Sequence, residues 1–405
     1  MQGGTGMVLE FRYCIEQQAP VEPWGASPTS RRSSPSLRYL LTGLLPLVCG
    51  ATVSVPLGAQ QAGPTVRGLV SGYASVGYSA ATEGDFHNDF TAALSPLLLY
   101  QVAEDVLFEG EFDVELEDSN TEMHLEHAQI HYLGFERLQF TAGMFHLPFG
   151  VWMHPNWVNR MPTPPLLYED SHGSPPSEAL LPILFDVGAM ARATLPLMQG
   201  WTTSASVWVS QGPAAGLAHG HGEEEPPEEP HEEGVSDASP LGFGSNFEDN
   251  NSDKMVGLQL RAVSQGGLIL QGSGFRAAYD DDGDLGVYGL NLSMIWTPGA
   301  DQPLFDLRGE GVLLSQEFLH DDGVESVDYG GYYLQLSRRA GAFEPVIRWS
   351  HLPRVIAGEG PVVEERRQLA VGLNYWIAPS IPVKAAYHVE PDGTDGFFLE
   401  WAVGF

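Results

Sequence analysis

Apolar and acidic residues alternate strictly between Val106 and Glu117. One parity carries Val106, Phe108, Phe112, Val114 and Leu116, and the other carries Glu109, Glu111, Asp113, Glu115 and Glu117. Successive side chains of a β-strand point to opposite faces of the sheet, so this alternation predicts a strand with one apolar face and one wet face.

Similar stretches recur to the end of the chain and, with the first one, predict sixteen strands. They cover residues 66–79, 88–101, 106–117, 122–133, 137–147, 187–195, 201–211, 254–264, 267–279, 285–297, 303–316, 329–339, 342–351, 366–377, 381–390 and 396–405. The connections alternate between tight turns, such as 134–136 and 340–342, and long loops, 148–186 and 212–252 among them. Short turns at one end and long loops at the other are typical of an outer-membrane barrel. The sequence therefore predicts an all-β fold, a transmembrane antiparallel β-barrel of about sixteen strands with short periplasmic turns and long extracellular loops.

One predicted strand leaves the strand count open. In the stretch 267–279, Arg276 shares its parity with Leu268 and Leu270, so its lipid-facing side is ambiguous and the number of strands could differ by two. A soluble β-sandwich or β-propeller is the alternative, because alternation alone also describes a sheet that covers a core. No propeller-like repeat is present in the sequence, and one parity stays apolar in most strands while the other is often charged. A closed barrel also leaves no unpaired strand edge in lipid.

The end of the chain supports the barrel independently. Phe397, Leu399, Trp401, Val403 and Phe405 alternate up to a terminal phenylalanine. This ending resembles the signal that bacterial outer-membrane barrels present to their assembly machinery. It predicts the bacterial outer membrane as the location, with membrane lipid and the barrel assembly machinery as partners.

The N-terminal region has the order of an export signal. In residues 31–59, three arginines precede a short apolar core and a small-residue exit, which is typical of a secretory signal peptide. Residues 1–30 form an upstream extension of doubtful status, and residues 60–405 form the predicted barrel. Both cysteines, Cys14 and Cys49, fall before residue 60, so the mature chain would have neither a disulfide nor a cysteine-ligated metal. Val48 precedes Cys49, which disfavours the alternative of a lipid-modified cysteine.

The acidic balance argues against one class of partner. The chain has 19 lysines and arginines against 52 aspartates and glutamates, a formal net charge of −33. Binding of nucleic acid needs clustered basic residues, so DNA and RNA are disfavoured as partners.

A pair of neighbouring segments resembles a known family. Glu126-His-Ala-Gln-Ile-His-Tyr132 is followed by Leu138-Gln-Phe-Thr-Ala-Gly-Met-Phe-His-Leu-Pro-Phe-Gly150. Together these residues resemble the bacterial porin O/P family of phosphate-selective porins, whose members have a strand ending similar to Ala-Gly-x-Phe-x-x-Pro-Phe-Gly. The resemblance implies a porin-like channel. Phosphate selectivity in that family relies on rows of basic residues, whereas the clearest wet-face row of this chain is acidic.

Parity also assigns the residues that line the barrel interior. If the apolar parity faces lipid, the acidic column of Glu109, Glu111, Asp113, Glu115 and Glu117 lines the lumen. The same assignment places these basic residues on the lumen side: Arg67, Arg192, Arg261, Arg308, Arg348 and Lys384, alongside Asp306, Glu310 and Glu344. Opposed acidic and basic walls would set ion preference across a pore. The alternative is that these charges only hydrate the interior or pair with one another.

The loop 148–186 is the third on the long-loop side. In porins the third loop commonly folds inward and narrows the pore. Constriction residues would then include Trp157, Arg160, Glu169 and Asp170. An external cap is the alternative.

Histidines provide weak candidates for metal ligands. On a strand, His127 and His131 share one face, and the acidic, proline-rich segment after His219 also holds His221 and His231. A solvated surface loop is the plainer interpretation of that segment. The sequence predicts no cofactor and no enzyme activity, because nucleophile-elbow, zinc-protease and phosphate-loop motifs are missing.

Two functions follow from these patterns. The first is a passive channel for small hydrophilic solutes or ions, with a bias towards cations from the acidic column. The second is an outer-membrane surface protein whose acidic, histidine-bearing loop captures divalent metal ions. Porins of this size are often trimers, so a homotrimer is also an expectation.

Overall fold

The structure is a computed structural model that describes residues 68–81, 89–117, 120–151, 159–168, 185–213, 252–279, 285–299, 304–320, 323–353, 355–357, 360–363, 365–391 and 395–405. No helix long and apolar enough to cross a membrane occurs in this part of the chain.

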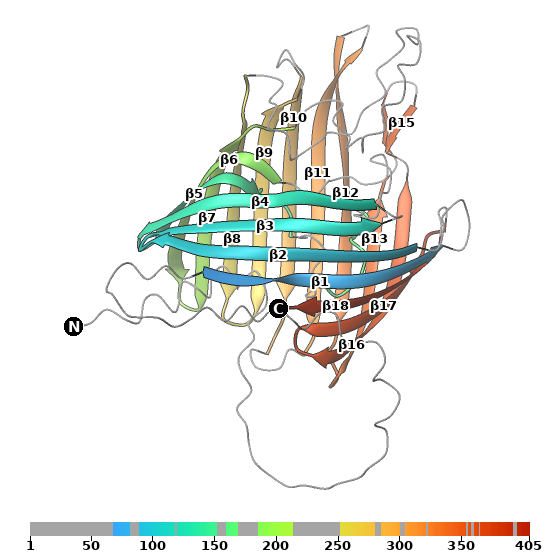
Figure 1. The fold of residues 1–405 in the computed structure, drawn as a ribbon. Coiled ribbons are helices and arrows are strands. Elements are labelled where there is room, and N and C mark those ends of the chain that lie inside the picture. The colour runs from blue at the N-terminus through green and yellow to red at the C-terminus, as the bar shows by residue number, and fades with distance from the viewer. Residues whose placement is uncertain are drawn as a thin grey trace, which may run out of the picture. The chain divides into compact units, whose positions relative to one another are not determined.

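Sixteen antiparallel strands pair in one closed barrel (Figure 1). They are β1 (Gly68–Ala81), β2 (Asp89–Ala103), β3 (Val106–Glu117), β4 (Asn120–Phe135), β5 (Leu138–His146), β6 (Phe185–Met198), β7 (Trp201–Ser210), β8 (Met255–Ser264), β9 (Leu268–Ala278), β10 (Gly286–Trp296), β11 (Asp306–His320), β12 (Gly323–Ser337), β13 (Phe343–Leu352), β16 (Arg366–Ala378), β17 (Ile381–Val389) and β18 (Gly396–Gly404). Two short strands, β14 (Val355–Ala357) and β15 (Gly360–Val363), form a separate two-stranded sheet between β13 and β16.

The first and last strands close the barrel. β1 and β18 run antiparallel with Gly77 opposite Glu400, and the Phe405 and Gly72 backbones exchange two hydrogen bonds of 3.0 Å. The Ser71 hydroxyl also donates to the Phe405 carbonyl oxygen at 2.8 Å. Closure leaves no strand edge unpaired, which a membrane-spanning sheet requires.

The predicted barrel fold is confirmed, with two local differences. The predicted strands 303–316 and 329–339 are joined by a longer ladder, because β11 and β12 stay paired as far as His320 and Gly323. Gly323, Glu325 and Asp328 interrupt the apolar alternation there, so the pattern understated the length of this hairpin. The short strands β14 and β15 were not predicted, since three or four residues are too few for a periodic pattern.

Arg276 resolves the ambiguous facing of β9. Its side chain is exposed on the outer face, and the guanidinium lies 5.6 Å from the centre of the Tyr288 ring. Leu270 is also exposed, whereas Phe275 and Ala277 are buried on the inner side. The strand therefore keeps its parity, and the barrel keeps sixteen strands.

The outer face of the barrel is apolar. On β13, exposed Phe343, Ile347 and Trp349 alternate with buried Glu344 and Arg348. Phe90 and Leu292 are 74% and 72% exposed. Such a surface is stable in hydrocarbon and unfavourable in water, which agrees with a location in the bacterial outer membrane.

Part of the interior is apolar as well. Large buried side chains from β9 to β12, including Phe275, Val287, Val312 and Leu314, pack with Leu167 in one cluster. On these strands the inner parity is therefore mixed, with buried polar residues such as Asn291 and Glu310 on the same strands as the apolar cluster. This packing positions the part of the chain that follows β5.

Candidate functional site

The segment that resembles the porin O/P family turns the chain into the barrel. Phe145, Leu147 and Phe149 are all buried in the interior apolar cluster. Gly143 has a φ of +126°, and a Cβ there would lie 2.3 Å from the Ala128 carbonyl oxygen. Only glycine fits this approach to β4, which gives the glycine of the motif a structural role.

Residues 148–151 are held by the wall formed by β8, β9 and β11. Gln259 donates to the Pro148 carbonyl oxygen and Gln271 donates to the Gly150 carbonyl oxygen, both at 2.9 Å. The Glu310 carboxylate accepts a 3.1 Å hydrogen bond from the Val151 amide. Three wall residues thus satisfy backbone groups that would otherwise be buried without partners.

Glu310 also receives two short side-chain hydrogen bonds. The Tyr168 hydroxyl and the Asn291 amide both donate to Glu310 Oε1, each at 2.6 Å. Gly150 adopts a φ of +89°, and a Cβ there would lie 2.3 Å from the Tyr168 hydroxyl. A side chain at position 150 would therefore displace the tyrosine that reaches the carboxylate.

The inward segment, residues 159–168, is bonded to the wall formed by β13, β16 and β17. Arg348, which has no exposed side-chain surface, donates to the carbonyl oxygens of Thr163 at 2.8 Å and Pro164 at 2.7 Å. Asn374 donates to the Arg160 carbonyl oxygen at 2.9 Å, and His388 Nε2 lies 2.7 Å from Thr163 Oγ1. These contacts place the described part of the third long loop inside the barrel.

Arg160 is the one predicted constriction residue that the structure describes. Its Nε lies 2.9 Å from Glu344 Oε1, and its guanidinium lies 5.6 Å from the centre of the Trp376 ring. Trp376 Nε1 donates to Glu344 Oε2 at 2.8 Å, and Arg339 lies over the same ring at 4.7 Å. Partial burial lowers the pKa of Arg339, and the nearby positive charge of Arg160 adds to that effect while Glu344 opposes it. Two arginines, one carboxylate and one indole form a compact group.

Two carboxylates of the acidic column on β3 contact histidines on β4. Glu109 lies between two imidazoles, with its oxygens 3.1 Å from both His127 Nε2 and His131 Nε2. His127 Nδ1 is 3.6 Å from Glu111. His131 Nδ1 lies 3.0 Å from Thr141 Oγ1. The two predicted metal-ligand candidates on β4 are thus bonded to a carboxylate of the column.

The other members of the column differ in their surroundings. Asp113 is buried and accepts a 2.6 Å hydrogen bond from the Ser95 hydroxyl. Glu115 is partly buried and lines an interior cavity. The backbone of Glu117 ends β3, and its side chain lies outside the described residues. The ladder shifts register between Glu111 and Phe112, so the column contains an irregularity that strict alternation did not predict.

Most predicted basic residues of the lumen have nearby polar partners. Arg308 Nε donates to Asp306 Oδ1 at 2.7 Å, and Lys384 Nζ donates to Glu400 Oε1 at 2.8 Å. Arg192 donates to the Ser206 hydroxyl at 3.0 Å. Arg261 lies opposite Gln271 in the β8–β9 ladder and is partly buried.

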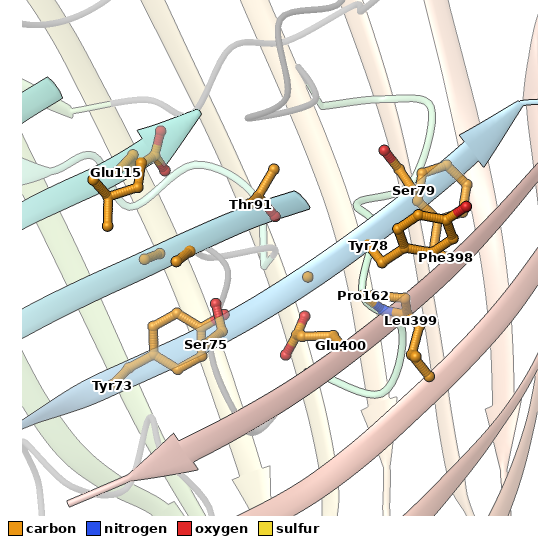
Figure 2. A pocket seen from close by; sticks show the side chains of 14 residues that line it. Tyr73, Ser75, Tyr78, Ser79, Thr91, Glu115, Pro162, Phe398, Leu399 and Glu400 are labelled. Atoms are coloured by element: carbon orange, nitrogen blue, oxygen red, sulfur yellow. The ribbon is translucent and has the colours of Figure 1, made fainter. Parts of the chain in front are cut away.

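Sequence reasoning missed several residues that line the interior cavity. Figure 2 shows Tyr73 and Ser75 from β1, Thr91 from β2, Glu400 from β18 and Pro162 from the inward segment around this cavity. Glu400 has the parity opposite to Leu399 and Trp401, so the terminal alternation contained the signal for its inward direction. The small polar residues carried no such signal, since they occur on either face of a strand.

The remaining predicted residues lie outside the described part of the chain. They are Arg67, Trp157, Glu169, Asp170, His219, His221 and His231, together with the regions 1–30 and 31–59. Among the described residues, no group of three or more histidines, cysteines, aspartates or glutamates is arranged to hold a metal ion.

Comparisons with known proteins bear on the fold. No protein-family model matches the sequence, and the specific part of the resemblance to the porin O/P family is confined to residues 126–150. No curated protein matches the chain either. The outer-membrane channel DcaP of Acinetobacter baumannii is 10% identical with a TM-score of 0.53, and the match covers 84% of this chain and 97% of that one. OmpF of Salmonella typhi, solved in complex with daunomycin, is 10% identical with a TM-score of 0.50 over the same two shares. The chain has the fold of the bacterial outer-membrane porins.

Proposed function

We propose that this protein is a passive channel of the outer membrane for small hydrophilic solutes, with a preference for cations. The observation that supports the channel is an inner segment bonded to the barrel wall inside a closed barrel. An inward loop narrows the lumen of a sixteen-stranded barrel and so limits the size of the solutes that pass. The polar part of the interior stays compatible with water.

The cation preference follows from how the charges are paired. The basic side chains Arg160, Arg308 and Lys384 each lie within 3 Å of a carboxylate, which cancels most of their field. In the β3 column, Asp113 accepts a hydrogen bond from the Ser95 hydroxyl, and Glu109 lies beside the imidazoles of His127 and His131. The balance of charge along this wall is therefore negative, and negative rings favour cations. Phosphate, the solute that the porin O/P resemblance implies, does not suit such a wall.

Conductance in planar lipid bilayers tests the channel. The purified barrel should produce stepwise ion currents, and a KCl gradient should give a reversal potential of the sign set by K⁺ permeation. Barrels that insert without any current would refute the channel, and a reversal potential set by Cl⁻ would refute the cation preference.

Neutralising Glu115 should weaken the cation preference. The expected fall in the ratio of K⁺ to Cl⁻ permeability for Glu115→Gln is about twofold, because a unit charge about 8 Å from an ion contributes roughly 0.5 kcal/mol in water and salt screens part of it. Glu325→Gln is the matched control, since Glu325 is exposed on the β11–β12 hairpin. Equal ratios in Glu115→Gln and the unaltered protein would contradict the assignment of this carboxylate to the pore.

A further inference from the structure

Arg276 brings a positive charge to the apolar outer face of the barrel. It is exposed on β9, and its guanidinium lies over the Tyr288 ring of β10. Among the residues that the structure describes, no carboxylate lies within ion-pair distance of this guanidinium. Arg367 on β16 is also exposed but differs, because it donates to the Glu365 carboxylate. The charge of Arg276 therefore remains open to a partner outside the described chain.

The register of β9 and β10 gives the depth of Arg276 in the membrane. Arg276 lies opposite Tyr288, and Leu268 lies opposite Trp296 at the other end of the ladder. The two aromatic side chains are exposed and lie about 20 Å apart along the membrane normal, close to the height of the apolar band that aromatic residues flank in such barrels. Because β9 begins directly after the short turn 265–267, Arg276 lies at the outer boundary of this band. An arginine is costly at the bilayer centre and tolerated at this boundary, where lipid headgroups lie.

An apolar groove runs over the outer face of β8 to β11, deeper in the membrane than Arg276. In the ladders Gly272 separates Leu260 from Leu292, and both leucines are exposed. The two leucines thus stand on strands about 10 Å apart, and the strand between them has no side chain at this level. Gly311 lies on the other side of Leu292. The groove therefore has apolar walls and a backbone floor, which suits a hydrocarbon chain.

The spacing of Arg276 and the groove matches the two parts of a lipid. Gly272 and Arg276 lie on the same strand, about 13 Å apart along it and about 10 Å apart in depth. The hydrocarbon region of one leaflet is about 15 Å deep. A lipid whose phosphate meets Arg276 would therefore have its acyl chains at the level of the groove.

We propose that Arg276 and this groove bind one lipid A molecule, the phosphorylated and acylated glycolipid of the outer leaflet. The guanidinium pairs with a lipid phosphate, to which it can donate two parallel hydrogen bonds. The Tyr288 ring supports the guanidinium through a cation–π contact. One acyl chain lies in the groove beside Gly272 and Gly311. This site does not depend on the proposed channel function.

Native mass spectrometry of the purified barrel in detergent, with added lipid A, tests the site. The unaltered protein should hold one lipid A, and Arg276→Gln should bind it about tenfold more weakly, because a charge-assisted pair is lost. Arg276→Lys should have an intermediate affinity, since it keeps the charge but not the parallel hydrogen bonds. Arg367→Gln is the matched control and should bind as the unaltered protein does. Lipid A without its phosphates should bind Arg276→Gln and the unaltered protein equally.

Gly311→Leu tests the acyl part of the site. A Cβ at Gly311 would lie 3.9 Å from its nearest neighbours, so a side chain is compatible with the fold and fills the groove. We expect lipid A to bind about threefold more weakly, because detergent offers the chain another apolar environment and only van der Waals packing is lost. Ala191→Leu is the control, since Ala191 lines a second outer groove on β4 to β7 whose described lining residues include no basic one.

Three results would overturn the proposal. The first is an equal lipid A affinity in Arg276→Gln, Arg367→Gln and the unaltered protein. The second is an unchanged affinity in Gly311→Leu beside a loss in Arg276→Gln, since the charge would then act without the groove. The third comes from the number of barrels per particle in the same spectra. If Gly311→Leu changes that number and leaves lipid A affinity unchanged, a second copy of the chain covers this face instead of a lipid.

Discussion

Replacing Lys384 by methionine should destabilise the barrel by about 3–5 kcal/mol, because it leaves a buried carboxylate without its cationic partner. Lys384 has no exposed side-chain surface, its partner Glu400 is 9% exposed at the side chain, and Nζ lies 2.8 Å from Oε1. Unfolding in denaturant, followed by tryptophan fluorescence of the barrel in lipid vesicles, measures this loss.

The double variant Lys384→Met with Glu400→Gln is the control. It removes both charges, so it should regain most of the stability lost in the single variant. If the stability lost in the double variant equals the sum of the losses in Lys384→Met and Glu400→Gln, the two side chains are not energetically coupled. Lys384→Met should also raise the ratio of K⁺ to Cl⁻ permeability, since Glu400 lines the interior cavity and would lose its neutralising partner.

Replacing Arg348 by methionine should release the inward segment. The guanidinium donates to the carbonyl oxygens of Thr163 and Pro164, and each acceptor left unsatisfied in the interior costs about 1–3 kcal/mol. The expected result is a less stable barrel whose single-channel current is noisier and larger on average, because the segment samples positions away from the wall. Bilayer recordings and denaturant unfolding measure the two effects.

Arg366→Met is the matched control for this change. Arg366 is bonded to Glu390 at 3.0 Å and 3.1 Å, and its side chain is 26% exposed. The substitution is chemically the same, and none of these contacts involves residues 159–168. Comparable current noise in Arg348→Met, Arg366→Met and the unaltered protein would show that Arg348 does not hold the segment in place.

Strand alternation was sufficient to predict the barrel. Successive side chains of a β-strand point to opposite faces of the sheet, so the apolar parity in the sequence identifies the residues that face lipid. The same rule predicted inward directions for Arg348, Glu310 and Lys384, which the structure places in the interior. It performed poorly where glycines and acids interrupt the apolar parity, as between β11 and β12.

The partners of the inward side chains were not predictable in the same way. Glu109 lies between His127 and His131, and Arg160 meets Glu344 across 184 residues of chain. Such contacts depend on which strands lie across the lumen and on where the inward segment packs. No local pattern in the sequence encodes which strands face one another across the lumen or where the inward segment packs.

By itself, the sequence determined that the chain forms a closed barrel with an apolar outer face, because alternation and turn spacing are local properties of each strand. Tertiary structure alone decided that Phe275, Val312 and Leu314 pack on the inward segment and that the space inside lies beside Ser75 and Ala93. Parity states whether a side chain points inward but not what fills the interior. That depends on the volumes of side chains from many strands packed together with one loop.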